Sequence, residues 1–197
     1  WIGFDYRQNR FREMTNLTRL QRVEDVRDGF VWRTELGYSG SGLGATEDRV
    51  VLNMDFRDVL HVTQTNYASY TLSQSGTYRL DEDRVENLLG TASVQYFHGG
   101  SERWNSWYTN LAFTAAHNLT ADQQLLIGGE NGLRGYPSEY QQGGPDEGVL
   151  KDVGFGMRLA SSRIEVQRML HLDFAFPLDG DDSIDDFQIL LRGRSQF

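Results

Sequence analysis

The chain has 197 residues, a formal net charge of −9 at pH 7 and no cysteine. The length suits one ordinary domain or part of a larger one, and the negative charge argues against nucleic-acid binding, which usually shows a basic footprint. The absence of cysteine excludes disulfides and thiolate zinc sites. Aromatic residues make up 12% of the chain, and 21 glycines stand against three prolines, which favours strands and turns over helices.

Apolar and polar residues alternate with a period of two along most of the chain, which predicts strands whose successive side chains point to opposite faces. Residues 13–27 alternate poorly, and we expect a loop or short helix there. Residues 80–87 and 178–186 are acidic and read as connectors. About ten strands are expected, near residues 1–12, 28–40, 48–58, 60–72, 86–98, 103–116, 122–129, 149–161, 165–178 and 187–197.

Each expected strand has one apolar and one polar face, and many run to ten residues or more. Strands of soluble proteins usually have about five or six residues, whereas a tilted membrane-spanning strand needs about 9–11. The lengths favour an antiparallel transmembrane β-barrel of outer-membrane type, with apolar faces toward lipid and a polar lumen. A soluble barrel with its apolar face inward is the alternative.

The last expected strand carries a terminal pattern of apolar residues on one face: Phe187, Ile189, Leu191 and Phe197. Soluble domains usually end in a frayed polar tail instead, so this pattern favours the membrane interpretation. At the other end, Trp1 to Phe4 reads like the middle of a strand and predicts that the sequence is a piece of a longer protein.

Four stretches together resemble one known family: "LLIGGENGLRGYPSEYQQG", "DVGFGMRL", "LHLDFAFPLDG" and "FQILLRGRSQF". They are similar to the barrel of the bacterial surface-antigen superfamily, which includes outer-membrane assembly factors (BamA and TamA) and two-partner-secretion transporters (FhaC-like). The resemblance implies an all-β fold, the C-terminal portion of a transmembrane barrel, and location in the bacterial outer membrane. It also implies a role in secreting or inserting other polypeptides.

The resemblance implies a functional loop motif at Leu133, Arg134, Gly135 and Tyr136. In the family this motif lies on a long extracellular loop that folds back into the lumen. A guanidinium in a confined lumen needs a partner, and its planar fork suits a carboxylate. Glycine beside it allows the backbone a sharp turn.

The expected partner of Arg134 departs from the family pattern. Family members hold the arginine with the Asp of an aromatic-x-Asp-x-Gly strand, and comparison with the family pattern implies that a hairpin is missing here near residues 143–148. Asp152-Val153-Gly154 retains an Asp-x-Gly without the preceding aromatic residue. The candidate partners are therefore Asp152, Asp173 and Glu165.

Enzymatic and metal functions find little support in the sequence. A hydrolase triad of His171 and Asp173 with Ser161 or Ser162 lacks any pattern that fixes its geometry. The four histidines show no metal-ligand spacing, and the acidic stretch 179–186 lacks the spacing of a calcium loop. We therefore expect no enzyme activity, no metal and no cofactor.

The alternation and the resemblance together predict one partial barrel domain over residues 1–197. The resemblance implies contact with outer-membrane lipid and a polypeptide substrate, and the negative net charge argues against nucleic acid. Two alternatives stay open: a passive pore or barrel anchor for another domain, and a soluble ligand-binding β-barrel.

Overall fold

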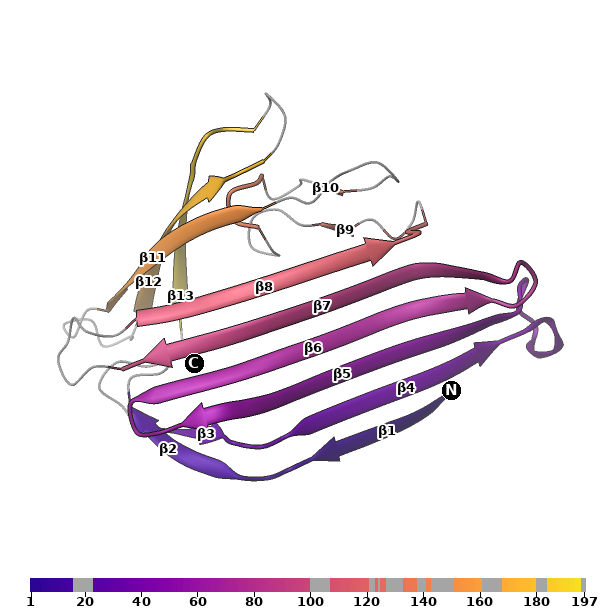
Figure 1. Cartoon of the computed structure of the whole chain (residues 1–197), viewed down its shortest axis with the longest axis horizontal. Coiled ribbons are helices and arrows are strands. Elements are labelled where there is room, and N and C mark those ends of the chain that lie inside the picture. The colour runs from indigo at the N-terminus through magenta and orange to yellow at the C-terminus, as the bar shows by residue number, and fades with distance from the viewer. Residues whose placement is uncertain are drawn as a thin grey trace. The chain divides into compact units, whose positions relative to one another are not determined.

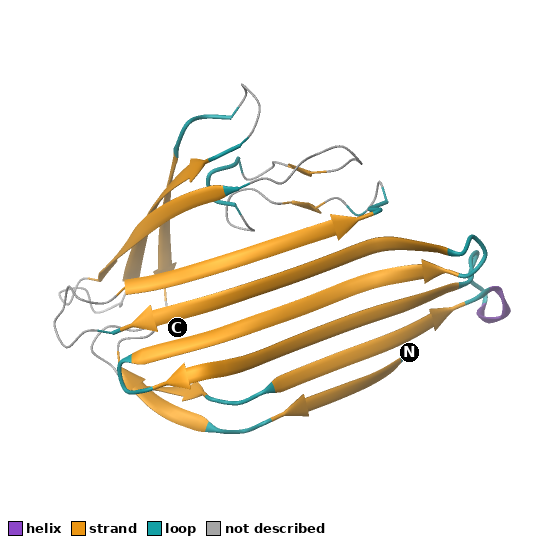
Figure 2. Cartoon of the chain, in the orientation of Figure 1, coloured by secondary structure: helices purple, strands orange, loops and turns teal. Residues whose placement is uncertain are grey.

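The computed structural model is all-β, and its sheets are antiparallel (Figures 1 and 2). It describes residues 1–15, 23–99, 107–120, 123, 125–126, 133–137, 141–142, 151–160, 168–179 and 184–195. Among these residues no helix has the length and apolar character needed to cross a membrane. The strands are β1 (Ile2–Arg7), β2 (Phe11–Thr15), β3 (Val23–Arg27), β4 (Val31–Ser39), β5 (Arg49–Val62), β6 (Asn66–Arg79), β7 (Arg84–His98), β8 (Trp107–His117), β9 (Leu125–Leu126), β10 (Gln141–Gln142), β11 (Asp152–Ala160), β12 (Arg168–Pro177) and β13 (Gln188–Ser195), with a single 3-10 turn, η1 (Ser41–Leu43).

The chain forms two compact units, Trp1–Thr120 and Ala121–Phe197. The ladders between described strands build open sheets, none of which closes on itself. A single barrel over residues 1–197 therefore stays a prediction, and the hairpin expected to be missing near 143–148 lies outside the described residues.

The first unit is a six-stranded sheet with the order β1-β4-β5-β6-β7-β8. Its central strands are long, with 14 residues in β5, 14 in β6 and 15 in β7. The register places apolar positions of neighbouring strands opposite one another, as with Trp32 and Phe56, and with Ala92 and Phe113. The alternation seen in the sequence therefore becomes two distinct surfaces.

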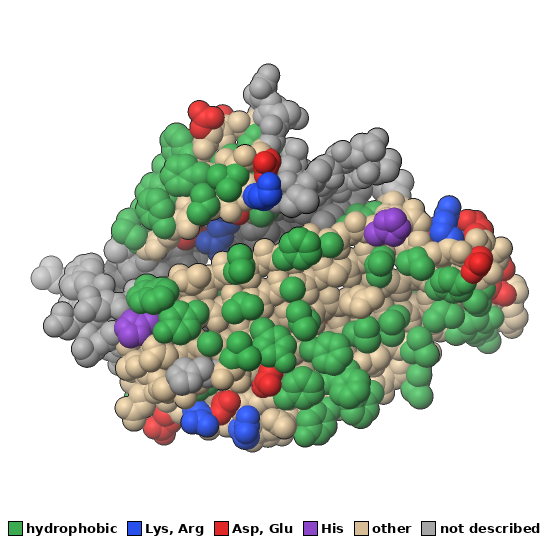
Figure 3. All heavy atoms as spheres, viewed as in Figure 1, with side chains coloured by type: hydrophobic (Ala, Val, Ile, Leu, Met, Phe, Trp, Pro, Cys, Tyr) green, Lys and Arg blue, Asp and Glu red, His purple; other side chains and the backbone are tan. Residues whose placement is uncertain are grey.

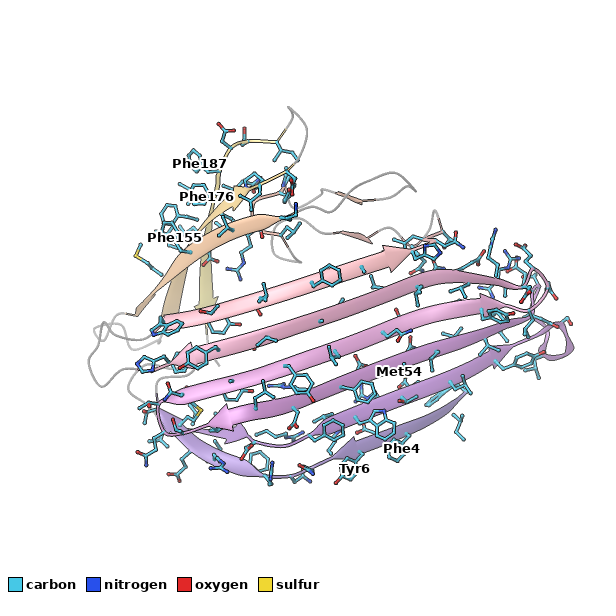
Figure 4. The ribbon with its side chains drawn as sticks, viewed as in Figure 1. Phe4, Tyr6, Met54, Phe155, Phe176 and Phe187 are labelled. Atoms are coloured by element: carbon cyan, nitrogen blue, oxygen red, sulfur yellow. The ribbon has the colours of Figure 1, made fainter. Side chains whose placement is uncertain are left out.

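One surface, here the apolar face, carries many exposed hydrophobic side chains spread over the strands of the sheet (Figure 3). Leu111, in the middle of β8, is 73% exposed. Aromatic rings pack along neighbouring strands, with centroids 5.1 Å apart for Phe4 and Trp32 and 5.6 Å apart for Trp32 and Phe56. The apolar face includes Ile2, Phe4, Tyr6, Trp32, Leu36, Tyr38, Leu52, Met54, Phe56, Leu72, Val94, Leu111 and Phe113 (Figure 4 labels Phe4, Tyr6 and Met54).

The opposite surface, here the polar face, carries charged, amide and hydroxyl side chains. Arg33 Nη2 lies 3.2 Å from the Asp5 carboxylate across the β1–β4 pair. A hollow of about 310 Å³ opens here, lined mostly by polar residues of β4 to β7. The polar face includes Asp5, Arg33, Glu35, Asn53, Asp55, Thr71, Ser73, Ser75, Thr91, Ser93 and Asn110.

A hairpin formed by β2 and β3 packs against one end of the sheet. The expectation of a loop or short helix over residues 13–27 is wrong, because Phe11–Thr15 pairs with Val23–Arg27. Only Met14 of the hairpin is fully buried, at 1% exposure. With charged residues at most other positions, the hairpin alternates too weakly for its strands to be visible in the sequence.

Strand boundaries in the middle of the chain also differ from those expected. The predicted strands 48–58 and 60–72 are wrong in their division: β5 continues to Val62, past a register shift between Val59 and His61, and β6 begins at Asn66. The turn between them contains neither Gly nor Pro. Thr63 stabilises it through its hydroxyl oxygen, which accepts hydrogen bonds from the backbone N–H of Asn66 at 2.9 Å and of Thr65 at 3.3 Å.

The second unit contains the three-stranded sheet β11-β12-β13 and the short pair β9–β10. The strands predicted near 149–161, 165–178 and 187–197 are confirmed as β11, β12 and β13, whereas the expected strand 122–129 is described only at Leu125–Leu126. Phe155 stacks on Phe174 with centroids 5.1 Å apart. This sheet too has an exposed apolar side, which includes Val153, Phe155, Met157, Phe176, Phe187, Ile189 and Leu191 (Figure 4 labels Phe155, Phe176 and Phe187).

Candidate functional site

The Leu-Arg-Gly-Tyr motif forms a tight turn that lies against β11 and β12. The backbone N–H of Tyr136 donates to the carbonyl of Leu133 at 3.2 Å, which closes the turn. Gly135 lies flat on the end of β12, where an added Cβ would be 2.7 Å from the backbone nitrogen of Pro177. Only glycine permits so close an approach, so the motif's third residue is fixed by contact with the sheet.

Arg134 forms an ion pair with Asp173, through Nη1 and Oδ2. The arginine side chain is 45% exposed, whereas the aspartate side chain is 11% exposed. Asp173 lies in the middle of β12, on the face opposite to the stacked Phe174. A charge-assisted bond to a nearly buried carboxylate is stronger than a surface pair, because removal of the arginine leaves that carboxylate uncompensated.

Gly156 makes room for this carboxylate. It stands directly opposite Asp173 in the β11–β12 ladder, and a Cβ built on it would overlap the carboxylate and its Oδ1 atom. The Asp173 side chain therefore lies across the missing side chain of its strand neighbour and remains on the sheet surface, where Arg134 reaches it.

Asp152 holds the next residue of the turn. Its Oδ2 accepts a hydrogen bond from the backbone N–H of Gly135 at 2.8 Å. Asp152 is the first residue of β11 and pairs with Pro177, so it lies at the same end of the sheet as the glycine contact. Two carboxylates thus bind two successive residues of the turn, one by its side chain and one by its backbone.

Tyr136 anchors the turn from the other side. Its ring is fully buried, and its hydroxyl lies 3.1 Å from the carbonyl oxygen of Lys151 and 2.5 Å from that of Asp179. The single hydroxyl proton serves one of these acceptors at a time. Burial raises the pKa of Tyr136 above its usual value, because the phenolate loses its hydration there.

These contacts join the turn to β11 and β12 at three successive residues. The arrangement braces a loop against a sheet, with the arginine and the tyrosine reaching in different directions from Gly135. Among the described residues, no three His, Asp or Glu side chains group to hold a metal ion. Chemically, the site offers charge pairing and hydrogen bonding that lock a backbone in place.

Of the candidate partners that the sequence offered for Arg134, Asp173 binds the guanidinium. Asp152 instead accepts a hydrogen bond from the backbone N–H of Gly135, the next residue of the motif. The third candidate, Glu165, lies outside the described residues. So do Ser161, Ser162 and the terminal Phe197. Phe187, Ile189 and Leu191 lie away from the site, on the exposed apolar side of the second unit, where Leu191 is 64% exposed.

Sequence reasoning missed Lys151, Asp179 and Gly156. Lys151 and Asp179 contribute backbone carbonyls to Tyr136. Because every residue has a backbone carbonyl, the sequence does not indicate which ones bind the tyrosine. Gly156 could have been found by aligning 152–160 against 168–177 as a hairpin, which puts a glycine opposite the only acidic residue of the second strand.

Comparison with protein-family models, with curated proteins and with solved structures finds no match to this chain.

Proposed function

We propose that this chain is part of a bacterial outer-membrane β-barrel that translocates or inserts other polypeptides. In this proposal, the apolar faces of both units contact lipid and the polar faces line a water-filled lumen. The Leu-Arg-Gly-Tyr turn folds into that lumen and is held there by Asp173 and Asp152.

The distribution of side chains over the two faces supports a membrane environment. In each unit most of the large exposed hydrophobic residues are on the apolar face, while the Asp5–Arg33 and Asp173–Arg134 ion pairs are on the other. So many exposed large hydrophobic side chains on one face of a soluble monomer would be an aggregation hazard. A lipid-facing sheet requires the same surface, together with a polar lumen.

Strand length supports the same environment. A transmembrane β-strand needs about 9–11 residues when tilted, and β5, β6, β7 and β8 have 14, 14, 15 and 11 residues. Such strands exceed the five or six residues usual in soluble sheets.

The Arg134–Asp173 ion pair is the observation that carries the polypeptide-handling part of the proposal. A turn that only connected two strands would need no buried carboxylate, no close-packed glycine and no buried tyrosine. The three anchors fix one loop conformation on the polar side of β11 and β12, which is what a brace or gate for the lumen requires. In the resembled family, the corresponding loop occupies the lumen of secretion and assembly barrels.

The outer edge of β13 supplies the second element of the mechanism. β13 pairs with β12 on one side, and none of the described strands pairs with its other edge. Unpaired backbone groups in lipid are costly, so such an edge recruits a strand. The partner strand comes from the rest of the barrel or from a polypeptide being inserted.

The test is an insertion assay in proteoliposomes that contain the full chain, with a urea-denatured outer-membrane barrel as the probe. Arg134→Ala should reduce the rate of probe insertion about tenfold, the effect of losing roughly 1.4 kcal/mol. The amount of heat-modifiable protein in the vesicles should stay unchanged. Lys151→Ala is the matched control, because it removes a neighbouring cation but keeps the carbonyl that Tyr136 uses.

The other outcomes point to the alternative functions. Normal probe insertion with Arg134→Ala, in a chain that is correctly embedded, would overturn the handling role and favour a passive pore or anchor. A chain that stays soluble without detergent and shows no heat-modifiable migration would favour the soluble ligand-binding barrel.

A further inference from the structure

The polar face of the first unit has one apolar seat, at the end where β2 and β3 pack. Four side chains of β5, β6 and β7 form it: Val59, Val62, Tyr67 and Phe97. Tyr67 and Phe97 are directly opposite each other in the β6–β7 ladder and are almost completely buried. Arg57 donates a 3.1 Å hydrogen bond to the Tyr67 hydroxyl, which orients the ring.

The β2–β3 hairpin fills this seat with two side chains. Met14 is buried among Tyr67 and Phe97, and Val26 packs against the same cluster. Met14 and Val26 lie on the same face of the hairpin, whereas Thr15 and Val23 lie on the other and are exposed. The hairpin therefore docks through one small apolar face, onto an apolar patch of the otherwise polar surface.

The connection between the hairpin and the sheet is an irregular stretch of the ladder. β1 pairs with β4 as far as Arg7 and Val31, and β2 pairs with β3 from Phe11 and Arg27 onward. Between them, the backbone N–H of Gln8 donates to the Phe30 carbonyl at 2.9 Å, and that of Asp28 donates to the Arg10 carbonyl at 2.8 Å. The backbone N–H of Phe30 instead donates to the side-chain oxygen of Gln8 at 3.3 Å, where a regular ladder would use a backbone carbonyl. An added Cβ on Gly29 would be 2.5 Å from the Gln8 carbonyl oxygen, so the chain bends there at glycine.

Charged groups hold the bend in its present form. Asp28 is buried and forms ion pairs with Arg12, through Nε, and with Arg10, whose Nη2 lies 3.7 Å away. Arg10 Nε also donates to the Asp28 carbonyl at 2.9 Å. Both arginines are more than half exposed, whereas the Asp28 side chain is 8% exposed. As with Asp173, loss of the arginines would leave a nearly buried carboxylate uncompensated, so these pairs help to keep the hairpin in its docked position.

We propose that the β2–β3 hairpin is a releasable plug, docked by Met14 over one end of the polar face and hinged at Gln8 and Gly29. Its docking surface is small, and one ladder bond at its hinge is replaced by a bond to the Gln8 side chain. Elements with few buried apolar contacts open locally at low free-energy cost. Release would expose Tyr67 and Phe97 and widen access to the polar face; the role of this opening in polypeptide passage rests on the proposed function.

A thiol-labelling experiment tests the plug. The chain has no cysteine, so Ser69→Cys introduces a single reporter. Ser69 is 2% exposed, lies on the polar face two residues from Tyr67 and stands opposite Val59, beside the seat. The rate of maleimide labelling of the folded full chain reports how often the hairpin leaves.

Met14→Asp in the reporter background should raise the labelling rate on the order of tenfold or more, since a buried methionine docks the hairpin. Met14→Ala should give a smaller increase in the same direction. Thr15→Asp is the matched control on the exposed hairpin face and should change the rate by less than about twofold, as expected of a surface substitution. Circular dichroism of each variant checks that the sheet remains folded.

Equal slow labelling of the Met14 variants and the Thr15 control would overturn the plug, because the hairpin would then stay docked without its anchor. Rapid labelling of the parent reporter would overturn it as well. The labelling rates do not depend on membrane insertion. If the insertion assay contradicts the proposed function, the labelling result therefore still tests whether the hairpin is released.

Discussion

Gly156 and Asp173 stand directly opposite each other in the β11–β12 ladder, and the carboxylate of Asp173 occupies the space that a side chain on Gly156 would fill. The glycine thereby determines where Arg134 finds its partner. Gly156 is not part of the Arg134–Asp173 ion pair, but the space left by its missing side chain sets the position of the Asp173 carboxylate.

Gly156→Ala should displace the Asp173 carboxylate and weaken its pair with Arg134. We expect a net loss of about 1 kcal/mol in the free energy of unfolding, because a lost charge-assisted bond outweighs the entropy gained when alanine replaces glycine. Urea unfolding in detergent micelles measures this change in the free energy of unfolding. In an Asp173→Ala background the same substitution has nothing to displace, and should become neutral or slightly stabilising.

Gly90→Ala is the matched control, because an added Cβ at this strand position meets nothing within 4 Å. If Gly156→Ala lowers the free energy of unfolding equally with and without Asp173, then the glycine affects the stability of β11 and not the ion pair.

Tyr136→Phe keeps the buried ring and removes the hydroxyl that donates to the carbonyls of Lys151 and Asp179. We expect a loss of about 0.5–1.5 kcal/mol at neutral pH, the usual net contribution of one hydrogen bond. Tyr38→Phe, on the exposed apolar face of β4, should have no measurable effect.

The raised pKa of Tyr136 predicts the pH dependence of this contribution. The folded state favours the protonated phenol, so the stabilisation is fully present below the unfolded pKa of about 10 and is lost as pH rises through the folded value. The difference in unfolding midpoint between the parent and Tyr136→Phe should therefore shrink above pH 10. A difference that grows above pH 10 would contradict the assigned direction.

Adjacent positions in the middle of β8 test the two faces of the first unit separately. Leu111→Arg places a charge on the apolar face and should destabilise the membrane-embedded protein by about 2–4 kcal/mol if it lies near the bilayer midplane. Asn110→Arg places the same charge on the polar face and should cost much less. Reversible unfolding from liposomes in urea measures both, and equal costs would argue against a lipid-facing surface.

Much of the strand pattern could be read from the sequence, because alternation is strong wherever one face is largely apolar, as in β4 and β12. The prediction of strands failed where only one side chain is buried, as with Met14 in β2, and where a turn has no Gly or Pro, as at Thr63. The site, too, was predictable only in part. Asp152 and Asp173 were identifiable as carboxylates on polar strand faces, whereas the carbonyls that bind Tyr136 and the space over Gly156 depend on strand register.

The proposed function requires the apolar faces to contact lipid, and quenching of tryptophan fluorescence by brominated lipid measures this contact directly. One variant would keep Trp107, on the apolar face of β8, as its only tryptophan. A second would replace every native tryptophan with phenylalanine and carry Asn110→Trp on the polar face. We predict strong quenching of Trp107 in proteoliposomes and weak quenching at position 110. Equal quenching at the two positions, or no quenching at either, would contradict the proposed contact between the apolar face and lipid.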